Sequence, residues 1–186
     1  FKKEPGIIVQ FFGDGEASRS TFGSALNLAS LWQLPILFVC ENNGVSIHAK
    51  FREMSATETI AERAKGYNVS SESARQTEPL QLIERAKKTV GKVRRERRPF
   101  IFEILGKRFV PHSSLYDTTP FLGSMLPQSE DSLLLLEKEL AGLNINKSAL
   151  LALQTSAKQS VDDAVGEAER SSALTLEEFL DIYNEQ

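Results

Sequence analysis

The chain has 186 residues, of which 41% are hydrophobic and 25% are charged, a composition typical of one globular domain with its own core. Its net charge of −3 and isoelectric point near 5.6 argue against a nucleic acid or an anionic membrane as partner, so small molecules or proteins are expected. No apolar run is long enough to span a bilayer, and the single cysteine, Cys40, has no second cysteine for an internal disulfide.

The N-terminal part of the chain predicts a βαβ unit. Residues 7–12 are rich in Ile, Val and Phe and are typical of a buried parallel strand. Ser20 or Thr21 is expected to cap a helix that ends before Pro35 and has apolar positions at Phe22, Leu26, Ala29 and Leu31. Residues 36–40 predict a second buried strand, parallel to the first and joined to it by a right-handed crossover.

The middle of the chain continues this alternation of helices and strands. We expect a short helix over residues 58–65, a weak strand over residues 67–69 and a strand over residues 100–105. Between the last two, Thr77 is a good cap for a helix with Pro79 in its first turn and an apolar face at Leu80, Ile83, Ala86, Val90 and Val93. The predicted fold class is therefore α/β, with a doubly wound and mostly parallel sheet.

The remainder of the chain divides into a long loop and a helical tail. Residues 106–128 show no clear period and are too many for a routine connection, which indicates a functional loop. Three helices are expected over residues 133–140, 150–168 and 175–183, the last of them opened by a capping box of Thr175 and Glu178. We therefore expect an α/β domain over residues 1–128, which includes the long loop over 106–128, and a C-terminal helical extension over 129–186.

Polar residues follow both strands of the βαβ unit. Asp14, between Gly13 and Gly15, follows the first strand, and the pair Asn42 and Asn43 follows the second. Because the carboxyl ends of parallel strands meet at one edge of the sheet, Asp14 and Asn43 are expected to be neighbours. Mg²⁺ prefers oxygen ligands and often joins a carboxylate to phosphate oxygens. We therefore predict that Asp14, Asn43 and the main-chain carbonyl of Val45 bind Mg²⁺ that carries a diphosphate.

These residues also resemble the signature of thiamine diphosphate enzymes. The segments FFGDG and ALNLASLWQLPILFVCENNG are similar to the alpha subunit of the decarboxylating component of 2-oxo acid dehydrogenase complexes of the pyruvate, acetoin and branched-chain types. The resemblance covers residues 6–46, resumes at RPFIFEILGKRFVPHSS and is faint in the helical tail. It implies a thiamine diphosphate-binding domain that lacks roughly the first half of such a subunit. The first residue, Phe1 rather than Met, likewise indicates a fragment or a processed chain.

The resemblance assigns roles to individual residues. It implies that Arg108 and His112 stand at the base of a mobile active-site loop, where the histidine borders the cofactor and orients the 2-oxo acid or the acyl-accepting lipoyl group. It also implies that Ile47 places an apolar group near the cofactor. The full set of implied cofactor-binding residues is Asp14, Gly15, Glu16, Ala17, Asn43, Val45, Ile47 and His112.

The resemblance further implies a reaction and partners. These are oxidative decarboxylation of a small 2-oxo acid, acyl transfer to a lipoyl-bearing acyltransferase, and a beta subunit that supplies the activating glutamate, in an α₂β₂ assembly. The chain alone would then be inactive. The expected location is the bacterial cytoplasm, with the mitochondrial matrix or a plastid as alternatives. Two other functions stay open: a split-chain thiamine-dependent decarboxylase or carboligase of the transketolase kind, and an inactive scaffold subunit.

Overall fold

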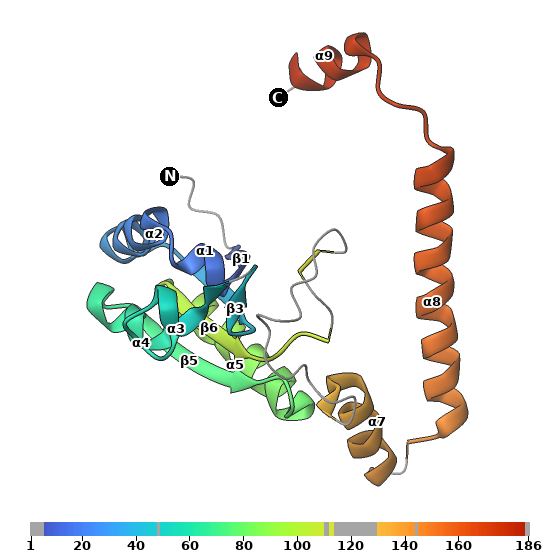
Figure 1. Ribbon diagram of the computed structural model, residues 1–186, viewed down its shortest axis with the longest axis horizontal. Coiled ribbons are helices and arrows are strands. Elements are labelled where there is room, and N and C mark those ends of the chain that lie inside the picture. The colour runs from blue at the N-terminus through green and yellow to red at the C-terminus, as the bar shows by residue number, and fades with distance from the viewer. Residues whose placement is uncertain (1–5, 48, 110–111, 114–129, 144, 185–186) are drawn as a thin grey trace. The chain divides into compact units, whose positions relative to one another are not determined.

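The computed structural model describes residues 6–47, 49–109, 112–113, 130–143 and 145–184 (Figure 1). The chain divides into two compact units, residues 1–139 and 140–186, each of which is described by itself below.

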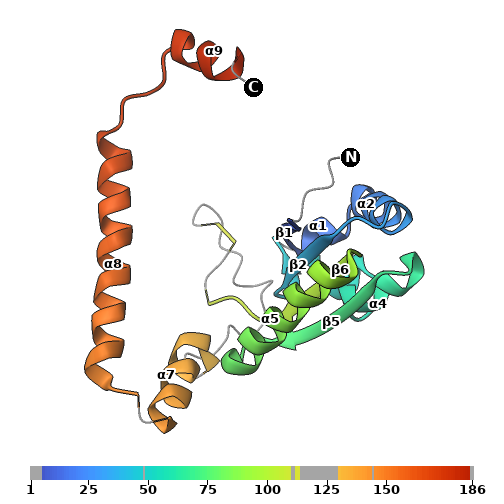
Figure 2. The ribbon, with the colours of Figure 1, turned by 180° about the vertical axis from the view of Figure 1, so that it is seen from behind.

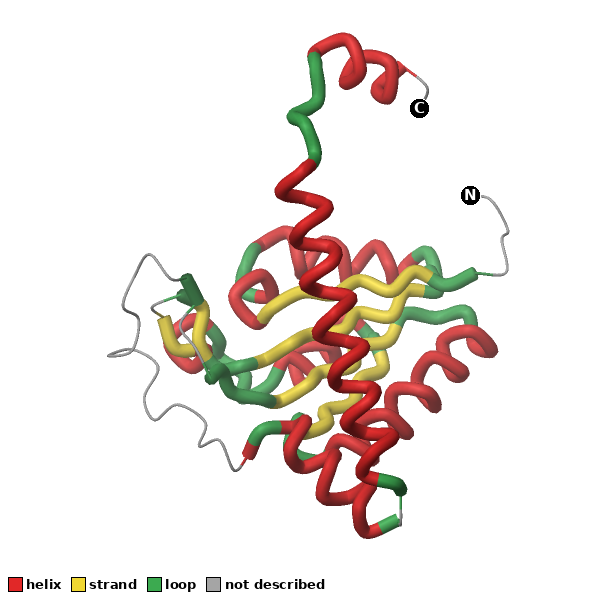
Figure 3. The backbone as a smooth tube through the Cα atoms, turned by 90° about the vertical axis from the view of Figure 1, so that its right-hand side faces the viewer, coloured by secondary structure: helices red, strands yellow, loops and turns green. Residues whose placement is uncertain are grey.

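The first unit is built around a four-stranded sheet. Its strands are β1 (Ile8–Gly13), β2 (Ile36–Asn42), β6 (Phe100–Leu105) and β5 (Ser70–Arg75), in the order β1-β2-β6-β5. All three neighbouring pairs are parallel, with β2 and β6 in the centre. The strands are the yellow segments of Figure 3. The predicted parallel sheet is thereby confirmed.

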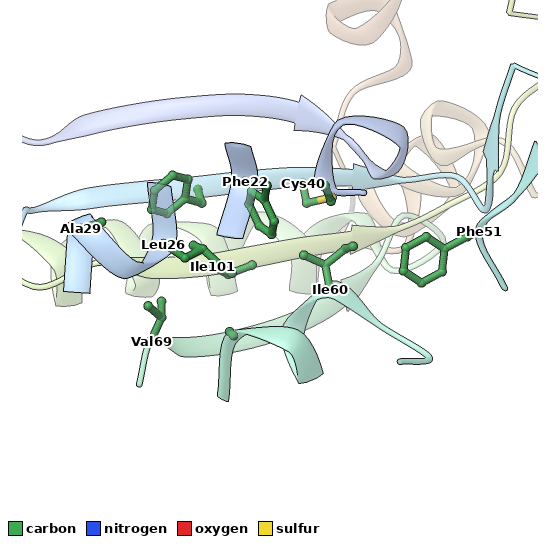
Figure 4. Close-up of a cluster of buried hydrophobic side chains, with 11 residues drawn as sticks. Phe22, Leu26, Ala29, Cys40, Phe51, Ile60, Val69 and Ile101 are labelled. Carbon is green, nitrogen blue, oxygen red and sulfur yellow. The ribbon is translucent and has the colours of Figure 1, made fainter. Parts of the chain in front are cut away.

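Helices cover both faces of the sheet. On one face lie α2 (Ser20–Leu31) and α4 (Ile60–Ala64), and their apolar residues form the cluster shown in Figure 4 with Cys40 and Ile101 of the central strands. On the other face lies α5 (Pro79–Glu96), which packs on Val39 and Phe102. Figure 2 shows the molecule from the side of α5. Because alternate strand residues enter opposite clusters, the sheet is doubly wound, as predicted.

The strand β1 differs from its prediction in one respect. It pairs in parallel with β2, but it stands at the edge of the sheet and is not buried, since Ile8, Val9 and Phe11 are 60%, 42% and 63% exposed. The opposite edge, β5, is polar, and its Glu72 forms an ion pair with Arg85 of α5. The two edges of the same sheet therefore have opposite character.

The strand β5 was not predicted. Residues 65–67 form a 3₁₀ helix, η1 (Lys65–Tyr67), in place of the expected weak strand, and Asn68 in the left-handed conformation leads into β5 two residues later. The sequence of β5, SSESAR, has almost no apolar residues, so hydrophobic periodicity gave no signal there. The expected short helix over 58–65 is found as α4, capped by Thr59, whose side chain accepts a hydrogen bond from the backbone N–H of Glu62.

The helices that flank the sheet also begin differently from expectation. A four-residue helix, α1 (Asp14–Ala17), follows β1 directly, and the N-cap of α2 is Arg19 rather than Ser20 or Thr21. Leu31 is 68% exposed and so lies outside the buried face of α2. The N-cap of α5 is Glu78 rather than Thr77. Its sheet-facing residues are Leu82, Ala86, Thr89, Val90 and Val93, with Ile83 on the exposed side.

A small antiparallel pair follows β2. It consists of β3 (Val45–Ser46) and β4 (Ala49–Lys50), and the short helix α3 (Phe51–Met54) comes directly after it. Phe51 is buried in the cluster of Figure 4, and its backbone N–H donates to the carbonyl of Gly44 at 2.8 Å. The segment after the Asn pair is therefore fixed to the core.

The C-terminal part is helical, as predicted, with α7 (Ser132–Gly142), α8 (Lys147–Arg170) and α9 (Leu176–Asn184). The predicted capping box is present: the backbone N–H of Thr175 donates to Glu178, and the backbone N–H of Glu178 donates to Thr175. None of the described residues of these three helices is buried. Of the predicted active-site loop, only residues 106–109 and 112–113 lie within the described residues. No helix in the described part of the chain is both long and apolar enough to cross a membrane.

Candidate functional site

The carboxyl ends of β1 and β2 bring Asp14 beside the Asn pair. Gly13, the last residue of β1, pairs with Glu41, so the chain leaves both strands at the same level. Asp14 is the first residue of α1 and is 2% exposed. The sheet topology thus makes neighbours of two segments that are separated in sequence by a whole helix and strand.

A tight turn follows β2, and the two Asn side chains fold it. The Oδ1 atom of Asn42 accepts a hydrogen bond from the backbone N–H of Gly44 at 3.0 Å, and the Oδ1 atom of Asn43 accepts one from the N–H of Val45 at 3.2 Å. Gly44 has φ of +80°, a conformation that favours glycine. We call residues 42–45 the Asn turn.

Ser46, which follows the Asn turn directly, approaches α1 very closely. A Cβ atom added to Gly15 would lie 2.1 Å from Oγ of Ser46 and 2.8 Å from its Cβ, so only glycine fits there. The backbone N–H of Gly44 also faces the Asp14 carboxyl group and lowers its pKa. Asp14 and Gly15 therefore lie close to Gly44 and Ser46, respectively.

The pKa of Asp14 is raised in the folded chain. Burial is the largest influence and raises the pKa of Asp14, while the N–H groups of Gly15, Asp14 and Gly44 and the charge of Arg108 oppose that rise. Within the described part of the chain, its buried Oδ2 atom has no hydrogen-bond partner. Because a buried polar oxygen without a partner is destabilising, this atom suits a bound cation.

The donor set restricts which cation would fit. Among the described residues, no group of three or more His, Cys, Asp or Glu side chains is placed to hold a metal ion. A cation at Asp14 would therefore be held by at most two such side chains and would take its other ligands from neutral oxygens or from a bound anion. Among the described residues, the Oδ1 atom of Asn43 accepts one hydrogen bond, from the N–H of Val45, and keeps a second lone pair. Such a set suits Mg²⁺ bound through phosphate oxygens.

A second group of residues lies at the end of β6. The Nη1 atom of Arg108 is 2.9 Å from Nδ1 of His112, and the Arg108 charge acts on Asp14. Arg108 and Asn43 also line a common cavity of about 530 Å³. The structure thus brings Arg108, His112 and Asp14 to the same edge of the sheet.

Three other predicted site residues, Glu16, Ala17 and Ile47, each have a different environment. Glu16 forms an ion pair with Arg19 at 2.9 Å, and both side chains are largely exposed. Ala17 is fully buried in the apolar cluster, and its carbonyl accepts a hydrogen bond from Arg63. Ile47 is 45% exposed with φ of +54°, which is a strained conformation for a β-branched residue and is typical of functional sites.

Sequence reasoning missed two residues of this region. Gln76 lines the cavity, and its Oε1 atom accepts a hydrogen bond from the backbone N–H of Lys107 at 3.0 Å. Glu103 of β6 is completely buried and accepts a hydrogen bond from Asn42. Gln76 follows the unpredicted strand β5, so its position had no signal, whereas a lone Glu inside the apolar run FIFEIL was a visible anomaly.

Known proteins match most of the chain. Residues 1–177 match a family described as dehydrogenase E1 component. The alpha subunit of the pyruvate dehydrogenase E1 component of Zymomonas mobilis is 27% identical over 183 residues, which are 96% of this chain and 51% of that protein. The 2-oxoisovalerate dehydrogenase subunit alpha of Bacillus subtilis is 31% identical over 122 residues, 66% of this chain and 37% of that protein.

A third relative is named for a different activity. The alpha subunit of acetoin:2,6-dichlorophenolindophenol oxidoreductase of Bacillus subtilis is 34% identical over 112 residues, 60% of this chain and 34% of that protein. The chain thus spans about half the length of these curated relatives, or less.

Proposed function

This chain belongs to the dehydrogenase E1 component family, and from that premise we propose that it anchors the diphosphate of thiamine diphosphate, through Mg²⁺, in the alpha subunit of a 2-oxo acid dehydrogenase. The observation that carries the proposal is the buried Oδ2 atom of Asp14, which has no hydrogen-bond partner within the described residues and lies beside the Asn turn. A divalent cation would satisfy this oxygen and would offset the desolvation of the carboxylate.

In this proposal the residues around Asp14 divide the binding between them. Asp14, the Asn43 side chain and the Val45 carbonyl bind the cation. The backbone at Gly15 lies close to the diphosphate because no side chain intervenes. Glu16, Ala17 and Ile47 complete the wall on the cofactor side. The neighbouring Arg108 charge favours an anionic ligand at this edge of the sheet.

Arg108 and His112 act on the substrate side of the site. Thiamine diphosphate, when bound, supplies the electron sink for loss of CO₂ from a 2-oxo acid. The contact of Arg108 with Nδ1 of His112 fixes the imidazole, so its other nitrogen faces away from the guanidinium. Because Arg108 has only donors, Nδ1 is the acceptor in this pair and Nε2 carries the proton of the neutral ring. We propose that this Nε2–H group orients the 2-oxo acid or the acyl-accepting lipoyl group.

The proposal includes partners, because the relatives are named as alpha subunits. We propose a beta subunit, which contributes the glutamate that activates the cofactor, and a lipoyl-bearing acyltransferase, which accepts the acyl group. Three relatives are named for pyruvate, 2-oxoisovalerate and acetoin, which supports a small oxo or hydroxy-oxo compound as substrate.

The test is a calorimetric titration of the chain, alone and with its beta subunit, with thiamine diphosphate and Mg²⁺. We expect D14N to weaken binding at least tenfold, because even outer-shell changes at metal sites weaken affinity by about 10–100-fold. D162N is the matched control, since Asp162 is exposed on α8, and it should bind like the wild type. Absence of Mg²⁺-dependent binding in both preparations, or equal binding by D14N, would overturn the proposal.

A further inference from the structure

Glu103 is the most unusual charged residue of the fold. It lies in the central strand β6 and is 0% exposed. Its side chain is on the same face as Ile101, toward α4, because strand residues two positions apart share a face. Glutamate is almost never fully buried unless its oxygens are bound, so its surroundings require an explanation.

Four donors from three other elements surround this carboxylate. Oε1 accepts hydrogen bonds from Nδ2 of Asn42 at 2.7 Å and from the backbone N–H of Ile60 at 2.9 Å. Oε2 accepts from the backbone N–H of Ala61 at 3.1 Å and from Oγ of Ser73 at 2.8 Å. These bonds fill the acceptor capacity of the carboxylate. None of the ion pairs among the described residues involves Glu103.

The Asn42 side chain links Glu103 to the Asn turn through two hydrogen bonds. An ionised carboxylate only accepts hydrogen bonds, so it fixes which end of the Asn42 amide faces it: the NH₂ group. The Oδ1 atom must then point the other way, where it accepts from the N–H of Gly44 at 3.0 Å. Gly44 lies between Asn43 and Val45, the two proposed cation ligands of the turn.

We propose that Glu103 is a positioning residue for the cation site, acting through Asn42 on the Asn turn. The two asparagines therefore have different tasks: Asn42, 6% exposed, transmits the orientation set by Glu103, and Asn43 binds the cation. The role of Asn43 rests on the function proposed above, whereas the effect of Glu103 on the turn does not.

The competing explanation is that Glu103 only joins α4 and β5 to the centre of the sheet. Its bonds to Ile60, Ala61 and Ser73 do so, and the bond to Asn42 would then be incidental. Ser73 separates the two explanations. S73A removes one donor from the same carboxylate but leaves the Asn42 side of it intact, and is therefore the matched control.

The experiment compares wild type, S73A, N42A, E103Q and the double variant N42A/E103Q with three measurements. Hydrogen exchange of the Gly44 amide, followed by ¹⁵N NMR on the unliganded chain, reports on the turn itself. Mn²⁺ affinity in the presence of thiamine diphosphate, measured by electron paramagnetic resonance with the beta subunit present, reports on the cation site. Urea unfolding measures the global free energy of unfolding. With that value, the part of the Gly44 exchange rate that comes from global unfolding can be subtracted.

We expect E103Q and N42A each to weaken Mn²⁺ binding about tenfold and to speed Gly44 exchange. In E103Q, the glutamine NH₂ group must face at least one donor, and the charge assistance of the bonds is lost. The double variant should bind no more weakly than either single variant, because both act through one chain of contacts. S73A should lower the urea midpoint while leaving Mn²⁺ affinity within about twofold of wild type.

Several outcomes would overturn the proposal. These are wild-type Mn²⁺ affinity in E103Q, losses that multiply in the double variant, or an effect of S73A as large as that of E103Q. If E103Q does not fold, N42A decides through Gly44 exchange, and a wild-type rate there would overturn it. If wild type itself binds no Mn²⁺, the proposed function fails, while Gly44 exchange still tests whether Glu103 orders the turn.

Discussion

The buried carboxylate of Asp14 lowers the stability of the unliganded chain. Its pKa in the folded chain is raised above the unfolded value, chiefly by burial. The folded state therefore holds the Asp14 proton to higher pH than the unfolded state does. In the pH range between the two pKa values, stability falls as pH rises, and above that range the deficit is complete.

D14N should accordingly make the unliganded chain more stable than wild type at neutral pH. The difference should shrink on acidification and disappear below the usual aspartate pKa of about 4, where both side chains are neutral. Urea midpoints of the two chains between pH 3 and 8 test this. A wild-type chain as stable as D14N at pH 7, or a difference that grows on acidification, would contradict the description of Asp14.

The sequence predicted the positions of some single side chains and not of others. Asp14 and Asn43 were predicted as neighbours because strand ends and one crossover fix their position. Glu103 was not identified, because its four partners come from segments that only the folded sheet brings together. The cap of α2 was misplaced because Ser20 and Thr21 are good capping residues in general, whereas here Arg19 precedes the first helical turn.

Among the elements, the contact between α1 and β3 sets the geometry of the site. G15A would place a methyl group 2.1 Å from Oγ of Ser46, so one of the two segments must move. We expect the free energy of unfolding to fall by about 1–3 kcal/mol, as is typical of overpacking. Urea unfolding measures the loss.

Two further variants control the G15A prediction. G13A should change stability by less than about 0.5 kcal/mol, since nothing lies within 4 Å of its added Cβ and its φ of −93° suits alanine. S46G removes the atoms that collide with the new methyl group, so G15A/S46G should recover most of the loss. Equal stability of G15A and G13A would show that the segments are not in close contact.

The strands that were predicted from the sequence are those rich in apolar residues. The runs of β1, β2 and β6 are rich in Ile, Val and Phe and were found with bounds within two residues of the structure. The strand β5 was missed because it is at the sheet edge and its half-buried serines and Glu72 are held by polar contacts with β6 and α5. The four residues of α1 are too few to show a helical period.

At the scale of the whole molecule, stability resides in the first unit. Both apolar clusters are formed by residues up to Phe102, and no described residue of α8 or α9 is buried. Ending the chain after Gly142 should therefore leave the urea midpoint of the first unit within experimental error. The only tryptophan, Trp32, lies in that unit and provides the fluorescence signal. A clear drop in the midpoint would show that residues 143–186 contribute to the core's stability.

The apolar edge of the sheet has a practical consequence. Among the described residues, β2 is the only strand that pairs with β1, so the other side of β1 has no strand partner. An open, apolar strand edge is a template for edge-to-edge polymerisation. We therefore expect the six residues of β1 to limit the concentration at which the isolated chain stays monodisperse.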